Sequence, residues 1–252
     1  MQIDKLSNQY HNLFSIIEES GALKNPFFER CRRNELSEDE LRTYLINWFQ
    51  ITKTFAINTL NYSAMVARKL QLKQFTISRE RIEAFLLGVI EIAAVEFEST
   101  TKDRNNFHYK AFARLAPKLG IDVTKLDNDD YPLLSETLRL ALNIVEYFDD
   151  EDVISGFAIL FVVETIAYNI VESMNNSFAQ AKDPYGNMLY NINETWYISK
   201  HLILELEHSD EVSSMLKILN LNESQFETMK IKVAKVSNSF NNFWNALNEK
   251  KN

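Results

Sequence analysis

The stretch from Phe157 to Val171, FAILFVVETIAYNIV, decides the fold. It carries one ionisable charge at neutral pH, Glu164, and it is apolar on every side of a helix instead of along one stripe. A helix without a polar face has to be surrounded by other elements. The stretch therefore predicts a central helix buried inside a helical protein.

A second long helix is predicted to begin after Ser37. Ser37 and Glu40 form the Ser-x-x-Glu capping-box pattern that marks a helix N-terminus. Apolar residues then recur at helical spacing, which predicts a helix over 38–68. Similar spacing predicts helices over 4–19, 24–33, 78–101, 107–119, 132–148, 151–177, 191–217 and 223–249. No strand alternation competes, so the fold class is predicted to be all-α.

The composition favours one domain over residues 1–252. The chain has 252 residues and 46% hydrophobic content, enough for one substantial core. With 5 Gly and 4 Pro, few positions interrupt regular secondary structure, which suits long helices joined by short loops. The predicted breaks include Gly120, as the residue after a helix end, and the turn cluster 183–187.

Charge and cysteine content exclude several functional classes. The net charge of -8 opposes binding to nucleic acid, and no run of Lys and Arg is longer than Arg32-Arg33. No run of 18 or more apolar residues occurs and the N-terminus lacks an apolar leader, so no membrane association and a cytosolic location are expected. Cys31 is the only cysteine, so any metal has to be held by nitrogen and oxygen ligands.

Carboxylates interrupt two apolar helices. Besides Glu164, the stretch 84–97 is predicted to be buried and contains Glu91 and Glu96, with Glu98 directly after it. A lone carboxylate in an apolar interior costs several kcal/mol unless it is protonated, paired with a cation or bound to a metal. For Glu164 alone, a protonated core residue is as good an explanation as a metal ligand. Several such residues together favour a metal.

A helix near the C-terminal end offers the clearest ligand pattern. His201, Glu205 and His208 stand at i, i+4 and i+7 and share one face. The first and last are roughly 10 Å apart along the axis, a span that suits two adjacent metals better than one. His108 is a further candidate, provided that the polar break at 99–106 returns it to the site. His11, on an amphipathic first helix, is expected to be structural or exposed.

The type of ligand indicates the metal. Imidazole and carboxylate without thiolate suit non-haem iron, with manganese or zinc as alternatives. Helical bundles commonly hold two such metals with a pair of Glu-x-x-His motifs. Only the segment from Glu205 to His208 has that form here, so a ferritin-like bundle is the weaker choice.

The chain resembles the haem-oxygenase-like diiron oxidases, which share a single-domain helical bundle with the TenA, PqqC and CADD-like proteins. The resemblance runs roughly from Asn25 to Met215 and begins with NPFFERCRR at 25–33 and ELSEDELR at 35–42. It implies two Fe(II)/Fe(III) ions and O2 as co-substrate. The implied ligands are Glu98, His108, Glu164, His201, Glu205 and His208, with Glu91 added because it shares a face with Glu98. The family usually has Asp where this chain has Glu205.

The resemblance implies an O2-dependent oxidase or oxygenase that acts through a peroxo-diiron intermediate. A small amine- or carboxylate-bearing substrate is expected, resembling an amino acid or a fatty acid, with N-oxygenation, oxidative C–C cleavage, decarboxylation or nitrile formation as the outcome. An external electron donor and a homodimer are the expected partners. TenA-type hydrolysis is disfavoured because Cys31 lies away from the ligand helices. The alternatives are a metal-free enzyme resembling PqqC or TenA and a non-enzymatic interaction protein.

Overall fold

The computed structural model describes residues 2–72, 78–96, 108–181, 188–191 and 194–249. The described elements follow this order: α1 (Gln2–Glu19), α2 (Pro26–Arg32), α3 (Glu38–Gln71), α4 (Arg79–Glu96), α5 (His108–Phe112), η1 (Ala116–Leu119), α6 (Val123–Asp127), α7 (Ser135–Asp149), α8 (Val153–Met174), η2 (Asn175–Ala179), α9 (Trp196–Leu219) and α10 (Glu223–Glu249). Within these ranges no β-strand occurs, so the predicted all-α class is confirmed.

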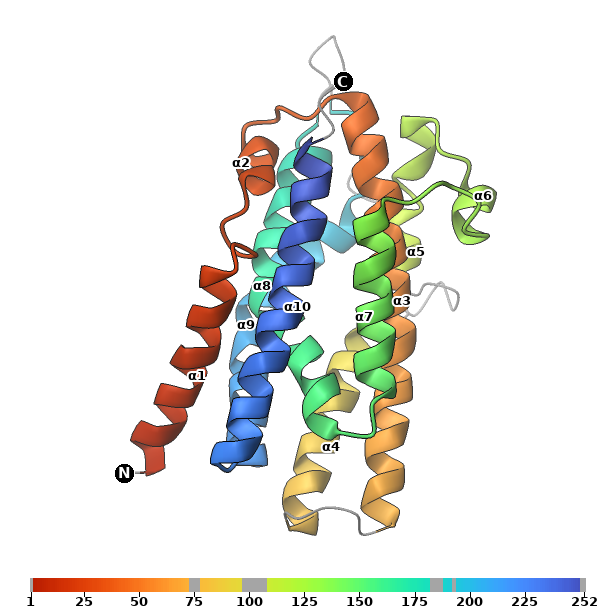
Figure 1. The fold of residues 1–252 in the computed structure, drawn as a ribbon. Coiled ribbons are helices and arrows are strands. Elements are labelled where there is room, and N and C mark those ends of the chain that lie inside the picture. Colours follow the sequence, from red (N-terminus) through yellow and green to blue (C-terminus); the bar gives the residue numbers. More distant parts are fainter. Residues whose placement is uncertain (1, 73–77, 97–107, 182–187, 192–193, 250–252) are drawn as a thin grey trace.

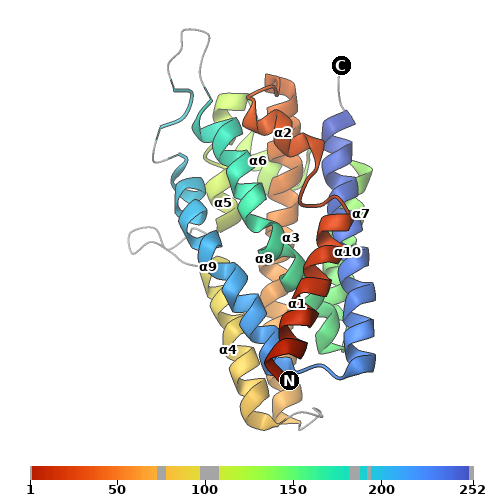
Figure 2. The same ribbon diagram turned by 90° about the vertical axis from the view of Figure 1, so that its left-hand side faces the viewer.

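The long helices form a closed ring. Going round it, α3 packs against α7, α7 against α10, α10 against α8, α8 against α9, α9 against α4, and α4 returns to α3 (Figure 1). The helix α1 lies along the outside of α10 and α9 (Figure 2). The short elements α2, α5, η1 and α6 gather toward one end of the ring (Figure 1). Each long helix therefore packs against two neighbours in the ring, and α8 is covered further by α7 and α2.

The helix α8 has the burial that its sequence predicts. Most of its side chains are buried, including every residue from Ile154 to Val162. The segment Val153–Ala179 is long and apolar enough to cross a membrane by length and composition. However, 72% of its most apolar window is buried inside the protein, which is typical of the core helix of a soluble protein.

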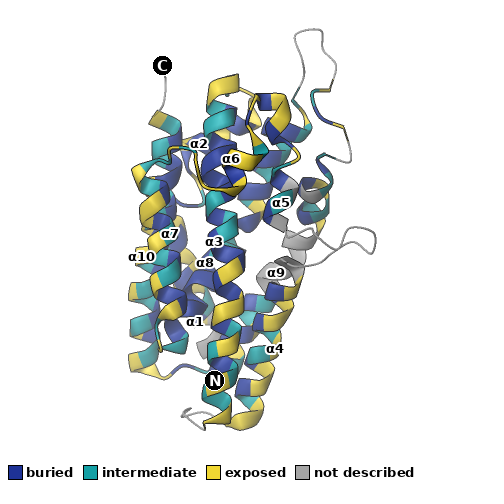
Figure 3. Ribbon diagram, turned by 90° about the vertical axis from the view of Figure 1, so that its right-hand side faces the viewer, coloured by how far each residue is buried: buried dark blue, intermediate teal, exposed yellow. Residues whose placement is uncertain are grey.

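The prediction that the stretch 84–97 is buried is wrong for part of α4. Leu87 is 60% exposed and Ile90 is 45% exposed, and Glu91 is exposed beside them. Figure 3 shows exposed residues along the outward sides of α3 and α4. The periodicity of an apolar helix does not reveal how many neighbours cover it. The helix α8 packs against α7, α9, α10 and α2, whereas α4 packs mainly against α3 and α9.

Helix termini follow the sequence signals closely in some places. The hydroxyl of Ser37 accepts from the Glu40 amide while the Glu40 carboxylate accepts from the Ser37 amide, which completes the predicted capping box. Gly120 has φ 65°, as expected for a residue that ends a helix.

Other boundaries differ from the prediction. The predicted helix over 107–119 is divided into α5 and η1, and α6 was not predicted. The turn cluster 183–187 lies outside the described residues.

Aromatic packing joins the two ends of the chain. Trp244 of α10 lies 5.9 Å from Phe27 and 5.0 Å from Phe28 of α2, measured between ring centroids. The amide of Asn25, which caps α2, donates to Asn241 at 2.8 Å and to Asn245 at 2.7 Å. The helix α10 thereby holds α2 against the rest of the ring.

A close contact fixes the distance between α3 and α8. The ring of Tyr62 is fully buried against Gly156, and its hydroxyl donates to the Val153 carbonyl at 2.6 Å. A Cβ atom placed on Gly156 would lie 2.3 Å from Tyr62 Cε2. Only glycine lets the tyrosine ring lie flat against the helix backbone there.

Candidate metal centre

Two of the predicted ligands are buried on helices that pack together. Glu164 of α8 is 6% exposed and His201 of α9 is 2% exposed, and α8 packs along α9. Burial of an ionisable pair of this kind has a free-energy cost that a bound cation can offset. A carboxylate oxygen and an imidazole nitrogen are also the donors that non-haem iron accepts.

The register of α9 extends this buried face past His201. Buried residues recur along the helix at spacings built from steps of three and four: Ile198, His201, Val212, Met215 and Leu219. Positions 205 and 208 fall on the same stripe, since they complete the steps between 201 and 212. The side chains of Glu205 and His208 themselves are outside the part of the chain that the structure describes.

The helices that carry the other candidates surround α9. His108 is the first residue of α5, and α5 contacts α9, α4 and α3. Tyr109, next to it, is buried and meets Phe49 of α3 edge to face at 5.5 Å between ring centroids. This contact holds the start of α5 at a defined position beside α3. The side chain of His108 and the whole of Glu98 lie outside the described residues.

Glu91 differs from Glu164 and His201 in its surroundings. It lies on α4, which packs against α9, but its side chain is exposed on the outward side of that helix. The structure therefore brings Glu164 and His201 into the interior and leaves Glu91 at the surface. Among the described residues, no group of three or more His, Cys, Asp or Glu side chains is assembled.

Cations near the front of the chain already have carboxylate partners. Arg32 forms ion pairs with Glu29 and with Glu172 at 2.9 Å, and Lys53 contacts Asp129 at 2.9 Å. A substrate carboxylate would have to compete with these partners. Their pairing favours a structural role for both Arg32 and Lys53.

Cys31 is poorly suited to nucleophilic chemistry. It is fully buried, and burial raises the pKa of its thiol to about 11, although hydrogen bonds to Ser177 and Ser173 oppose the rise. At neutral pH the thiolate is therefore scarce. The expectation that Cys31 lies away from the ligand helices is wrong, however, because α2 packs against α8 and the thiol contacts Ser173 of that helix.

Comparison with known proteins gives likenesses of structure only. No family model matches the chain, and no curated protein matches it significantly. A CADD-like protein of unknown function from Nostoc punctiforme superposes with a TM-score of 0.69 at 15% identity, over 96% of this chain and 96% of that one. A TenA homologue from Pseudomonas syringae pv. tomato superposes with a TM-score of 0.67 at 11% identity, over 99% of this chain and 93% of that one.

A third solved structure names the fold. A domain of unknown function with a haem-oxygenase-like fold, from Shewanella denitrificans, superposes with a TM-score of 0.63 at 13% identity, over 99% of this chain and 91% of that one. The chain thus has the haem-oxygenase-like helical fold along almost its whole length. The predicted fold is confirmed.

Proposed function

We propose that this chain is a cytosolic non-haem diiron enzyme that uses O2 to oxidise a small substrate carrying an amine or a carboxylate. The observation that carries the proposal is the burial of Glu164 and His201 on the packed helices α8 and α9. The stripe that contains His201 continues through positions 205 and 208. Ligand-type residues are thereby concentrated on one pair of helices inside an apolar core.

The residues proposed to hold the metals are Glu98, His108, Glu164, His201, Glu205 and His208. Glu91 stays a further candidate, and its exposed position makes it the weakest of the set. Glu205 is longer by one methylene than the Asp usual in the resembling family, which would shift its carboxylate relative to a metal. When bound, a pair of irons would supply the electrons that activate O2.

The protein's own contribution would be to position ligands and exclude water. Two fully buried apolar residues of α8 precede Glu164: Phe161 by about one turn and Phe157 by about two turns. A dry surrounding strengthens the attraction between carboxylates and cations and protects reactive species from water. N-oxygenation, oxidative C–C cleavage, decarboxylation and nitrile formation are all reactions that such a site could support.

Anaerobic reconstitution tests this proposal directly. Protein incubated with ferrous iron and freed of excess metal is expected to retain about two irons per chain, since the proposed ligand set spans two adjacent metals. Exposure to O2 should then change the visible absorption spectrum, whereas protein without iron should show no change. If the washed protein retains no iron above the level of a denatured control, a metal-free enzyme on the same fold is the better description.

Replacing Glu164 with glutamine separates metal binding from a structural role. Glutamine has nearly the same shape as glutamate and can still form hydrogen bonds, so the free energy of unfolding of iron-free Glu164→Gln should stay within about 1.5 kcal/mol of that of iron-free wild type. Added iron should raise the thermal midpoint of the wild type and leave that of the variant unchanged. Scanning calorimetry with and without iron measures both effects.

Glu146→Gln, at an exposed position on α7, is the matched control and should keep the iron-dependent stabilisation. If added iron raises the thermal midpoint of Glu164→Gln as much as that of wild type, the ligand assignment of Glu164 fails.

A further inference from the structure

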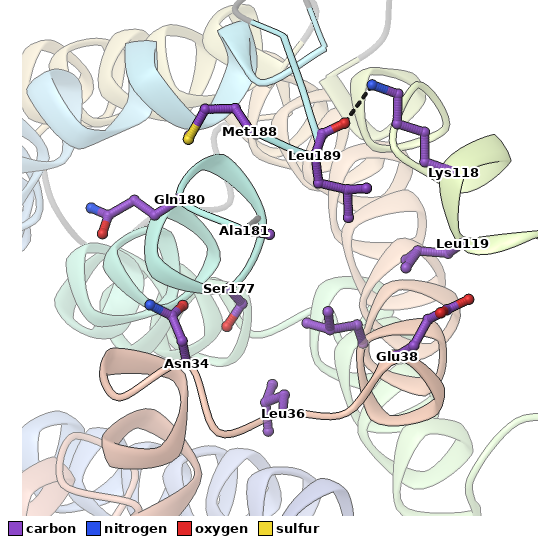
Figure 4. A pocket seen from close by; sticks show the side chains of 11 residues that line it. Asn34, Leu36, Glu38, Lys118, Leu119, Ser177, Gln180, Ala181, Met188 and Leu189 are labelled. Atoms are coloured by element: carbon purple, nitrogen blue, oxygen red, sulfur yellow. Dashed lines mark hydrogen bonds between the residues drawn. The ribbon is translucent and has the colours of Figure 1, made fainter. Parts of the chain in front are cut away.

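An open cavity of about 830 Å³ lies at the end of the bundle where α2 turns into α3 (Figure 4). Segments far apart in the sequence meet there: the loop before α3, the first turn of α3, η1, η2 and residues 188–189. Ser177, one of the lining residues, comes thirteen positions after Glu164, or roughly 20 Å along the helix axis at 1.5 Å per residue. The cavity is therefore separate from the candidate metal centre.

One wall of the cavity is a π-helical turn. The segment η2 continues α8 with wider turns, and π-helical segments within α-helices are found frequently at functional sites. Ser177 in this turn is 4% exposed, and its hydroxyl has no oxygen or nitrogen partner among the described residues. Its polar neighbour is the Cys31 thiol, which offers only a weak hydrogen bond.

Hydrogen bonds between segments hold the walls in place. The Leu189 amide donates to the Ala181 carbonyl at 2.8 Å, and the Lys118 ammonium donates to the Leu189 carbonyl. Arg42 of α3 donates to the Leu119 carbonyl at 2.8 Å. The cavity is thus formed in advance of any ligand, as small-molecule sites commonly are.

The lining combines an apolar surface with neutral polar groups. Leucines form much of the wall, at positions 36, 41, 119 and 189. Asn34, Ser177 and Gln180 add amide and hydroxyl groups, which can both donate and accept hydrogen bonds. This pattern fits a ligand with an apolar body and a head group that both donates and accepts.

The charges at the cavity are already balanced within the protein. Lys118 pairs with Glu194 at 2.9 Å, and Glu38 lies 3.7 Å from Arg42. A charged ligand finds no uncommitted opposite charge among the described lining residues and loses hydration on entering the apolar cavity. A neutral ligand avoids this cost.

We propose that this cavity is a second small-molecule site, which binds a neutral amphipathic molecule with an amide or hydroxyl head group. The ligand's apolar part lies against the leucines, and its head group exchanges hydrogen bonds with Asn34, Ser177 or Gln180. The site does not depend on the proposed metal centre.

Methyl NMR of the full chain tests the site with three probes of equal length: hexanamide, hexanoate and hexylammonium. Met188 lines the cavity and is 53% exposed, so its ¹³C-methyl resonance, assigned with Met188→Leu, reports on occupancy. Hexanamide should shift this resonance saturably and with at least tenfold higher affinity than either charged probe. No saturable shift, or equal affinity for all three probes, would overturn the proposal.

Variants locate the binding. Leu36→Trp should replace part of the apolar wall by a bulkier side chain and weaken hexanamide binding. Ser177→Ala should weaken it by about three- to tenfold, the usual effect of losing one neutral hydrogen bond. Leu142→Trp, at an exposed leucine of α7, is the matched control and should bind as wild type does. Unchanged binding by Leu36→Trp would refute the assigned location. Iron retention by Leu36→Trp should stay normal, so the two proposals succeed or fail separately.

Discussion

Replacing His201 with alanine is expected to abolish iron retention while the protein keeps its helical fold. His201 is 2% exposed on the inner stripe of α9, so no surface histidine can take its place. Loss of groups that merely orient metal ligands already weakens binding by about 10- to 100-fold, and loss of a direct ligand should exceed the upper end of that range. Iron content after anaerobic loading and gel filtration, alongside far-UV circular dichroism, measures both properties.

His11→Ala provides the comparison, because His11 is an exposed histidine on α1. It should retain iron at the wild-type level. His201→Leu, which fills more of the vacated space, guards against a packing defect in the alanine variant and should also lack iron. Iron retained by both His201 variants would remove this residue from the ligand set and, with it, the central support for the proposed function.

A single added methyl group at Gly156 is expected to destabilise the protein by about 3 kcal/mol or more. The new Cβ would lie within 2.3–2.8 Å of three atoms of the Tyr62 ring, and the ring is fully buried with its hydroxyl bonded to Val153. The ring has to move, which breaks that bond and opens space between α3 and α8. For a chain of this size the thermal midpoint should fall by roughly 6–12 °C, measurable by calorimetry.

Gly88→Ala is the control for the general effect of placing alanine in a helix. A Cβ at Gly88 would meet only the flexible side chain of Met215, at 3.0 Å. Alanine is also the better helix former by about 1 kcal/mol, so the free energy of unfolding should stay within about 1 kcal/mol of wild type. A similar loss in both variants would mean that the contact with Tyr62 is not the cause.

The sequence predicts most of the fold because its signals are local. The capping box at Ser37 and the apolar run of α8 depend on neighbouring residues alone, and both are confirmed. The exposed face of α4 could not be predicted, because apolar residues such as Leu87 and Ile90 would occur at the same spacing in a fully covered helix. The division of 107–119 into α5 and η1 has a local cause that the prediction did not use, because Pro117 lies at the start of η1 and cannot continue a helix from the preceding turn.

The candidate site was predictable in part for a related reason. A carboxylate in an apolar helix and a histidine on a shared stripe indicate burial, and Glu164 and His201 are buried. The exposure of Glu91 depends on where α4 lies in the ring, which its own sequence does not encode. The cavity beside η2 gave no sequence signal, because it forms from segments that meet only in the folded chain.

The packing of α10 against α1 and α2 has a consequence for how the chain is made. The helix α10 leaves the ribosome after every other described helix, yet Phe27 and Phe28 of α2 depend on its Trp244 for their cover. Until α10 has been synthesised, the nascent chain therefore presents these rings to water and to chaperones. Ribosome-stalled chains that stop before residue 223 should accordingly bind a hydrophobic dye more strongly than chains that include α10.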